Sequence, residues 1–349
     1  MNSEENYLKF LQESAQNAFV PLLANDFGDE ALSRLSHLTE NIRSIYKNLR
    51  LRDFNTITVY YTFDENLSLN KVAHNYVKVA NVEAFAGVNC ANLVVEITDN
   101  NVYYSTDWSL DPDSFRLQSI IYRLSGEKEF FFGKTELATL PKLPDSESYF
   151  QFRTFKDLEE AFEEYDLKRA KYSSCPHFKE LWVNSNRILF NPSPEEKMQE
   201  SLYDFLNLRL RGSPEVMPEQ NVDRSHPVDV KVTWKYSSHV ALIEVKWLGK
   251  SLSNSGGIVT RTDADARDGA YQLAEYLESN LHYARTKVVS GYLVVFDGRR
   301  RGANSTSTTI TKVKGEYYRN KHIVYHTKYE DIRADFEKPR RFFMEPITE

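Results

Sequence analysis

The 349-residue chain lacks the features that mark membrane, secreted and disulfide-stabilised proteins. No apolar run approaches the roughly 20 residues that a membrane helix needs. The N-terminal stretch MNSEENYLKF is acidic and polar, unlike a secretory signal peptide. The only two cysteines, Cys90 and Cys175, are too far apart to indicate a disulfide framework or a cysteine-based zinc site. We therefore expect a cytoplasmic protein with no membrane partner.

Several common catalytic signatures are also absent. The chain has no Gly-rich phosphate loop, no HExxH zinc motif, no GxSxG nucleophile turn and no recognisable Cys–His nucleophile pair.

Charge is unevenly distributed along the chain, whose net charge is −6. Residues 1–175 contain 18 Lys and Arg against 27 Asp and Glu, whereas residues 176–349 contain 26 against 23. Only the second half could present a basic face to phosphates by itself.

The order of predicted elements indicates an α/β protein, α+β overall, with two domains. Residues 1–175, which end in a charged helix at 155–172, predict an N-terminal α+β domain. Residues 176–349 predict a helix at 193–210, two strands within 226–247, a helix at 263–283 and an apolar strand at 287–298. Strands that alternate with helices favour a mixed sheet covered by helices.

Three charged residues interrupt the two otherwise apolar strands. Glu244 and Lys246 are two residues apart on one strand and therefore point to the same face, opposite Ile243 and Val245. If the strands pair as a hairpin, Asp229 comes near them. Two neighbouring carboxylates repel each other unless a cation lies between them, and Mg²⁺ prefers oxygen ligands. A lysine beside them can position or deprotonate a water. This set predicts metal-assisted phosphodiester hydrolysis.

These residues resemble the PD-(D/E)xK, or restriction-endonuclease-like, nuclease superfamily over about residues 190–300. Pro227-Val228-Asp229 stands where that family has its Asp motif, although the proline is two residues before the acid. Glu244-Val245-Lys246 matches the ExK element. Glu195 lies near the start of the preceding helix. Gln272 and Tyr276 in the following helix have the spacing of the QxxxY element.

The resemblance implies a Mg²⁺- or Mn²⁺-dependent nuclease with a defined set of roles. Asp229 and Glu244 would hold the metal, with the Val245 carbonyl as a further ligand, and Lys246 would position or activate the attacking water. Glu195 would support a second metal or a water, while Gln272 and Tyr276 would orient Lys246 or a phosphate. DNA is favoured over RNA as the substrate and internal cutting over end cutting, and a role in restriction-like or antiviral defence is implied.

Five arginines in the second half are candidates for contact with nucleic-acid phosphates: Arg261, Arg267, Arg299, Arg300 and Arg301. The last three form a basic loop directly after the apolar strand at 287–298. A solvated turn is an equally good reading of that loop.

Other interpretations of the whole set stay open. The three strand residues could form a solvated face with cross-strand ion pairs, and Glu195 could simply favour the helix dipole. The QxxxY pair could be the polar flank of an amphipathic helix. The second domain could then be an inactive or partner-regulated nuclease-fold module for binding or assembly. We expect residues 1–175 to sense, regulate, dock a protein partner or self-associate.

Overall fold

The computed structural model describes the chain apart from residues 1–16, 18, 29, 64–65, 67, 74, 81, 99–100, 141–146, 152, 211–213, 222–226, 236, 284–286 and 326–331. It confirms the mixed α/β class, with one mixed sheet in each of two compact units. The second unit begins at Thr154. In the described residues, no helix is long and apolar enough to span a bilayer.

The first unit is built on a seven-stranded sheet in the order β2-β4-β3-β1-β5-β6-β7. Among the described strands of this sheet, β1 and β3 pair in parallel and the other neighbours are antiparallel. The strands are β1 (Thr56–Thr62), β2 (Val77–Val79), β3 (Asn92–Ile97), β4 (Val102–Ser105), β5 (Ser119–Ser125), β6 (Lys128–Phe132) and β7 (Leu137–Leu140).

Helix α2 (Glu30–Tyr46) supplies the main helical layer of this unit, and α3 (Leu69–Val72) and α4 (Pro112–Phe115) are single turns. The apolar stripe of α2 is buried with alternate residues of β1, β3 and β5. Its members, Leu35, Leu38, Ile42 and Ile45, have the helical spacing that the sequence predicts.

A buried acid, Glu129 of β6, lies within the aromatic core of the first unit. Both of its carboxylate oxygens accept the backbone N–H of Tyr149, at 2.8 and 3.0 Å. Nearby, the Tyr46 hydroxyl donates to the Tyr122 hydroxyl at 2.9 Å. Burial raises the pKa of Glu129 to about 7, against the lowering effect of hydrogen bonds from Ser148, Tyr149 and Tyr122.

We expect the stability of the first unit to fall as the pH rises through this pKa. The folded state favours the protonated acid, so the stabilisation is complete below about pH 4.5 and is lost towards pH 7. A shift of this size corresponds to roughly 3 kcal/mol. Glu129→Gln should flatten the dependence of the thermal midpoint on pH between 5 and 8, measured by calorimetry. An unchanged slope in the variant would place the titration elsewhere.

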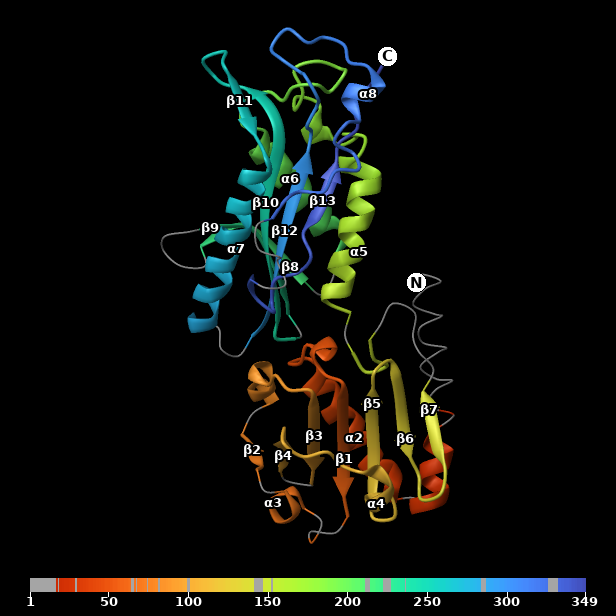
Figure 1. The fold of residues 1–349 in the computed structure, drawn as a ribbon. Helices are drawn as coiled ribbons and strands as arrows, with labels where there is room; N and C mark the ends of the chain where they lie inside the picture. Colours follow the sequence, from red (N-terminus) through yellow and green to blue (C-terminus); the bar gives the residue numbers. More distant parts are fainter. Residues whose placement is uncertain are drawn as a thin grey trace. The chain divides into compact units, whose positions relative to one another are not determined.

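The second unit is built on a sheet in the order β13-β12-β10-β9-β8, with β11 paired to β10. Its strands are β8 (Pro214–Asn221), β9 (Pro227–Trp234), β10 (His239–Leu252), β11 (Ile258–Arg261), β12 (Val288–Asp297) and β13 (Arg340–Phe343). Its helices are α5 (Phe155–Tyr165), α6 (Pro194–Arg209), α7 (Asp263–Tyr283) and the single turn α8 (Lys312–Gly315). Figure 1 shows α7 and α5 flanking the central strands.

Helices cover both faces of this sheet. On one face, Ile243, Val245 and Trp247 of β10 pack in a core that includes α5 and α6. On the other face, Leu242 and Leu248 pack in the core formed with α7. The alternation of β10 side chains therefore agrees with the strand register that the sequence predicts.

The units divide earlier in the chain than the expected boundary near residue 175. Helix α5 belongs to the second unit because its apolar side chains, Leu158, Ala161, Phe162 and Tyr165, lie in that unit's core. The charged residues of this helix suggested a solvated element of the first domain, but they cover only its outer face.

The helix predicted at 193–210 is α6, which begins with Pro194 in its first turn. Ser193 before it has a left-handed backbone, with φ of 55°, and its side chain makes no capping hydrogen bond. Ser193 thus occupies the N-cap position without capping the helix through its hydroxyl.

Candidate functional site

Asp229 and Glu244 lie where strands β9 and β10 stop pairing. The antiparallel ladder between these strands ends at Val230 and Ile243, one residue short of the two acids. Asp229 continues the connection through its side chain, because its Oδ2 accepts the backbone N–H of Val245 at 2.6 Å. Its Oδ1 accepts the side-chain amide of Gln199 in α6 at 2.7 Å. Asp229 is thus held rigidly between a strand and a helix.

Lys246 lies at the centre of the acidic group, by which we mean Asp229, Glu244 and Glu195. Its Nζ lies 2.5 Å from Glu244 Oε1 and 3.4 Å from Glu195 Oε1. The side chain of Glu244 is only 3% exposed and that of Lys246 16%, whereas that of Glu195 is 33% exposed. The site therefore opens towards solvent on the side of Glu195. The convergence of Asp229, Glu244 and Lys246 that the sequence predicts is present.

Burial and mutual repulsion shift the pKa values of this group. Burial raises the pKa of Asp229 to about 6, although the Val245 N–H and Lys246 oppose the rise. Burial and then the neighbouring Asp229 raise the pKa of Glu244 to about 8. Burial alone would lower the pKa of Lys246, but the charges of Glu244 and Glu195 outweigh it and raise the pKa. The site thus contains more negative charge than it can stabilise alone.

Helix α7 approaches the lysine closely at a glycine. A Cβ built on Gly269 would lie 2.5 Å from Lys246 Cγ and 3.1 Å from its Cε. Further along α7, Tyr276 is buried. Burial, followed by the charge of Glu244, raises the pKa of Tyr276 to about 12. Gln272 lies between them on the same helix face and is exposed. The structure thus brings Tyr276 to the site, while Gln272 has no hydrogen bond to it among the described residues.

Gly269→Ala should therefore impair the site without unfolding the protein. Alanine favours a helix interior by about 1 kcal/mol over glycine, but its methyl group would displace the stem of Lys246. A misplacement of about 1 Å can cost about 10²-fold in rate. We expect at least a tenfold loss of any catalytic activity, with a preserved thermal midpoint. Unchanged activity would show that the position of the lysine is not critical.

The described residues contain no group of three or more His, Cys, Asp or Glu side chains arranged to hold a metal ion. Two carboxylates nevertheless suit Mg²⁺, which is commonly bound through one or two acids with substrate oxygens and water completing its shell. One observation supports such a fit: Glu244 Oε2 is buried and has no hydrogen-bond partner in the described structure. The chemistry of Asp229 and Glu244 therefore fits a hard divalent cation. A ligand role for the Val245 carbonyl stays a prediction.

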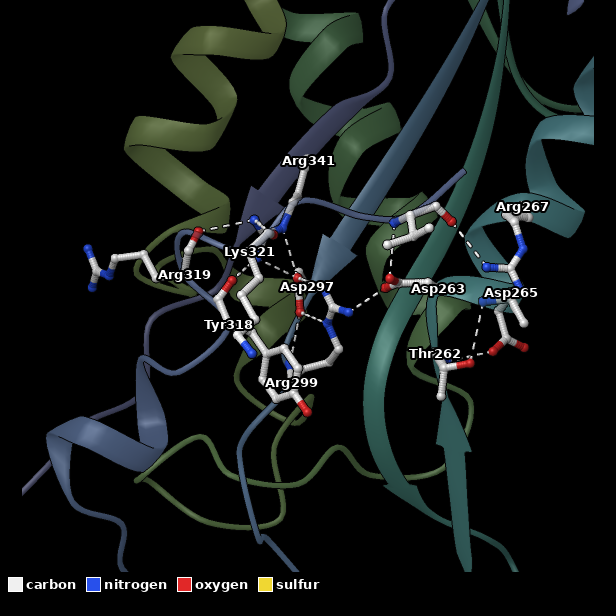
Figure 2. Close-up of polar contacts among 12 residues, drawn as sticks. Thr262, Asp263, Asp265, Arg267, Asp297, Arg299, Tyr318, Arg319, Lys321 and Arg341 are labelled. Atoms are coloured by element: carbon white, nitrogen blue, oxygen red, sulfur yellow. Dashed lines mark hydrogen bonds and ion pairs between the residues drawn. The ribbon is translucent and has the colours of Figure 1, made fainter. Parts of the chain in front are cut away.

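The structure changes the interpretation of the arginine loop (Figure 2). Arg299 pairs with Asp297 and Asp263, at 2.6 and 2.5 Å. Arg300 is 6% exposed, donates to backbone carbonyls including that of Met344, and has its pKa lowered to about 9 by burial. Arg299 and Arg300 thus stabilise the fold through internal contacts, and only Arg301 of the three is exposed to a ligand in solution.

Of the other two candidate arginines, Arg261 ends β11 and Arg267 lies near the start of α7. Arg261 is 49% exposed on its side chain and pairs with Asp265 at 2.6 Å. Arg267 donates to the backbone carbonyl of Val324 at 3.1 Å. Neither contacts the acidic group in the described structure, so a role for them at phosphates stays a prediction.

Sequence reasoning missed two residues of the site, Gln199 and Gly269. Gln199 lies one helical turn after Glu195, so the i,i+4 spacing offered a signal. Gly269 offered a weaker signal, because a glycine within a helix often marks a close approach. Two further acids of α6 lie outside the site: Glu196 is exposed, and Glu200 pairs with Lys197 at 3.0 Å.

Comparisons with known proteins identify no relative: no protein-family model, no curated protein and no solved structure matches this chain.

Proposed function

We propose that the second unit is a nuclease that hydrolyses phosphodiester bonds with the help of Mg²⁺ or Mn²⁺, and that DNA is its favoured substrate. The observation that carries the proposal is the convergence of Asp229, Glu244 and Lys246 at the end of one strand ladder. A structural ion pair alone would need one acid for the lysine, whereas this site gathers a second buried acid and a third, Glu195, at its solvent side.

The residues divide the work according to their positions. Lys246 lies between the buried Glu244 and the more exposed Glu195. Its ammonium group acts as a point charge that holds and orients the attacking water or a phosphate oxygen. Gln199 and the Val245 N–H fix the orientation of Asp229. Tyr276 and α7 exclude water from the buried side of the lysine. Glu195 is placed to accept a proton or to hold a water at the open side.

A divalent cation held by Asp229 and Glu244 would supply charge stabilisation at the phosphate. It would also offset the burial, and for Glu244 the repulsion by Asp229, that raise the pKa values of the two acids. Its affinity should therefore increase with pH across the range in which these acids lose their protons.

The test uses the purified full chain with supercoiled plasmid and linear single-stranded DNA, in Mg²⁺, in Mn²⁺ and in EDTA. We expect cleavage only with metal, and nicked or linear plasmid would indicate internal cutting. Glu244→Gln, which keeps the shape of the side chain, should remove both cleavage and metal binding by calorimetry. Structured RNA run in parallel would show whether DNA is preferred.

The matched control is Glu200→Gln, a similar change on α6 at an acid that pairs with Lys197 outside the site. It should leave cleavage and metal binding unchanged. If the parental chain binds metal and DNA but cleaves neither DNA substrate, the proposal is contradicted and a nuclease-fold binding module is favoured. Roles in restriction-like or antiviral defence and regulation by the first unit are part of the same proposal and rest on the resemblance.

A further inference from the structure

The segment 298–325 after β12 is unusually basic for this acidic chain. It contains seven Lys and Arg residues and a single acid, Glu316. The segment follows the end of a buried strand and includes the single turn α8. Its cations fall into two groups, which the structure treats differently.

The first group fixes the segment to the fold (Figure 2). The buried carboxylate of Asp297 receives Arg299 and also Arg341 of β13, at 2.6 and 2.7 Å. Arg341 in turn donates to the backbone carbonyls of Tyr318, Arg319 and Lys321. These contacts tie the backbone of residues 318–321, which carry Lys321, to β13.

The second group faces solvent. We name Arg301, Lys312, Lys314 and Lys321 the basic patch; all four are exposed. In the described structure none of them has an ion pair with an acid, whereas Arg299, Arg319, Arg333, Arg340 and Arg341 all do. The basic patch therefore carries uncompensated positive charge.

Two members of the basic patch, Arg301 and Lys321, lie over one aromatic ring, and a third, Lys314, is joined to Arg301 through the backbone. The guanidinium of Arg301 lies 4.5 Å from the centre of the Tyr317 ring, and Lys321 Nζ lies 3.7 Å from it. The backbone N–H of Arg301 bonds to the carbonyl of Lys314 at 3.1 Å. Contact with Lys321, and then the charge of Arg301, lowers the pKa of the Tyr317 hydroxyl, as a positive local potential requires.

The basic segment is also tied to the helix that lines the candidate site. Asp263 at the start of α7 accepts both Arg299 and the backbone N–H of Val324, at 2.5 and 3.0 Å. Gly269, which contacts Lys246, follows on the same helix. The rise from Asp263 to Gly269 is about 9 Å, so the anchor of the segment lies close to the candidate site.

From this arrangement we propose that the basic patch binds the phosphate backbone of DNA and directs the strand towards Lys246. The inference rests on the proposed function for the direction of the strand, but the binding surface itself does not depend on cleavage. Cations without acidic partners, arranged on a braced segment, favour backbone contact over recognition of base sequence.

The test measures binding of a fluorescein-labelled DNA duplex to the full chain by anisotropy in EDTA, at several salt concentrations. The variant carries Lys312→Gln, Lys314→Gln and Lys321→Gln. Each lost phosphate contact should reduce the slope of log affinity against log salt by about 0.9. We expect a slope smaller by about 2 to 3 and an affinity at least tenfold weaker at low salt.

The control variant carries Lys168→Gln, Lys179→Gln and Lys235→Gln, three exposed lysines of the same unit outside the basic patch. It changes the net charge equally and should leave the slope unchanged. The inference would be overturned if both variants lost binding equally, or if neither variant lost binding. The inference would also be overturned if the basic-patch variant lost more affinity for anionic lipid vesicles than for DNA. That result would favour a membrane surface as the partner.

The two proposals fail separately in this design. A parental chain that cuts DNA while the basic-patch variant binds normally would retain the nuclease and exclude the surface. A chain that never cuts but loses salt-dependent binding in the variant would retain the surface and exclude the nuclease.

Discussion

Lys246→Met is expected to abolish metal-dependent cleavage, lowering kcat/KM by about 10³-fold or more. General acid–base and electrostatic contributions of single positioned groups are typically of the order of 10²- to 10⁴-fold. Methionine retains much of the apolar stem that packs against Gly269 but removes the charge between Glu244 and Glu195. The measurement is single-turnover cleavage of a defined DNA substrate.

The fold should survive this change because the partner acid can take up a proton. Burial already raises the pKa of Glu244 to about 8, and loss of the lysine would raise it further. Circular dichroism and the thermal midpoint at pH 7 would verify the fold. The matched control is Lys250→Met on the same strand, whose amine bonds to the carbonyl of Ala303 at 2.6 Å. Cleavage by the Lys246 variant at the rate of the Lys250 control would remove the lysine from the mechanism.

The second prediction with a large expected effect concerns truncation of the protein chain. A fragment of residues 154–349 should fold by itself, whereas a fragment of residues 177–349 should not. The shorter fragment lacks α5, which contributes Leu158, Phe162 and Tyr165 to the core of the second unit. Burial of each such side chain contributes about 1.5–3 kcal/mol, so the loss approaches the whole stability of a typical domain, about 5–15 kcal/mol.

Both fragments can be compared by thermal unfolding and gel filtration. The longer one should show a cooperative transition and should retain metal binding, since all residues of the candidate site lie within it. A cooperative transition in the shorter one would mean that α5 is dispensable. A folded, metal-binding longer fragment that lacks the activity of the full chain would show that the first unit contributes directly to catalysis or to substrate binding.

The candidate site was predictable where it depends on short-range periodicity. Glu244 and Lys246 share a face because a strand repeats every two residues, and Asp229 meets them because two adjacent strands commonly form a hairpin. Glu195 could be placed on the inward face from the helical spacing of Met198 and Leu202, both of which are buried. These inferences need no knowledge of tertiary packing.

The remaining features depend on contacts between distant segments. The pairing of Gln199 with Asp229 depends on how α6 crosses the sheet, which no local pattern specifies. Arg299 appeared free because one of its acids, Asp263, is 36 residues away in the sequence. Arg300 could not be recognised as buried without the position of Met344.

The domain boundary shows a different limitation. The spacing of Leu158, Ala161, Phe162 and Tyr165 is that of an apolar helical stripe, so the sequence did contain a signal that α5 packs in a core. It did not indicate which core. Charge counted over the whole helix concealed the stripe, because the acids lie on the opposite side.

The bond between Asp229 and the Val245 amide gives this sheet an unusual weak point. Elsewhere the strands are joined by backbone groups, whose capacity for hydrogen bonding does not change with pH. Here the connection is a carboxylate whose pKa is about 6. Hydrogen bonds to an ionised acceptor are roughly twice as strong as those between neutral groups. The connection between β9 and β10 at the candidate site therefore depends on pH. Protonation of Asp229 weakens this one hydrogen bond, but the raised pKa means that the folded state as a whole favours the protonated acid, so stability falls as the pH rises through about 6.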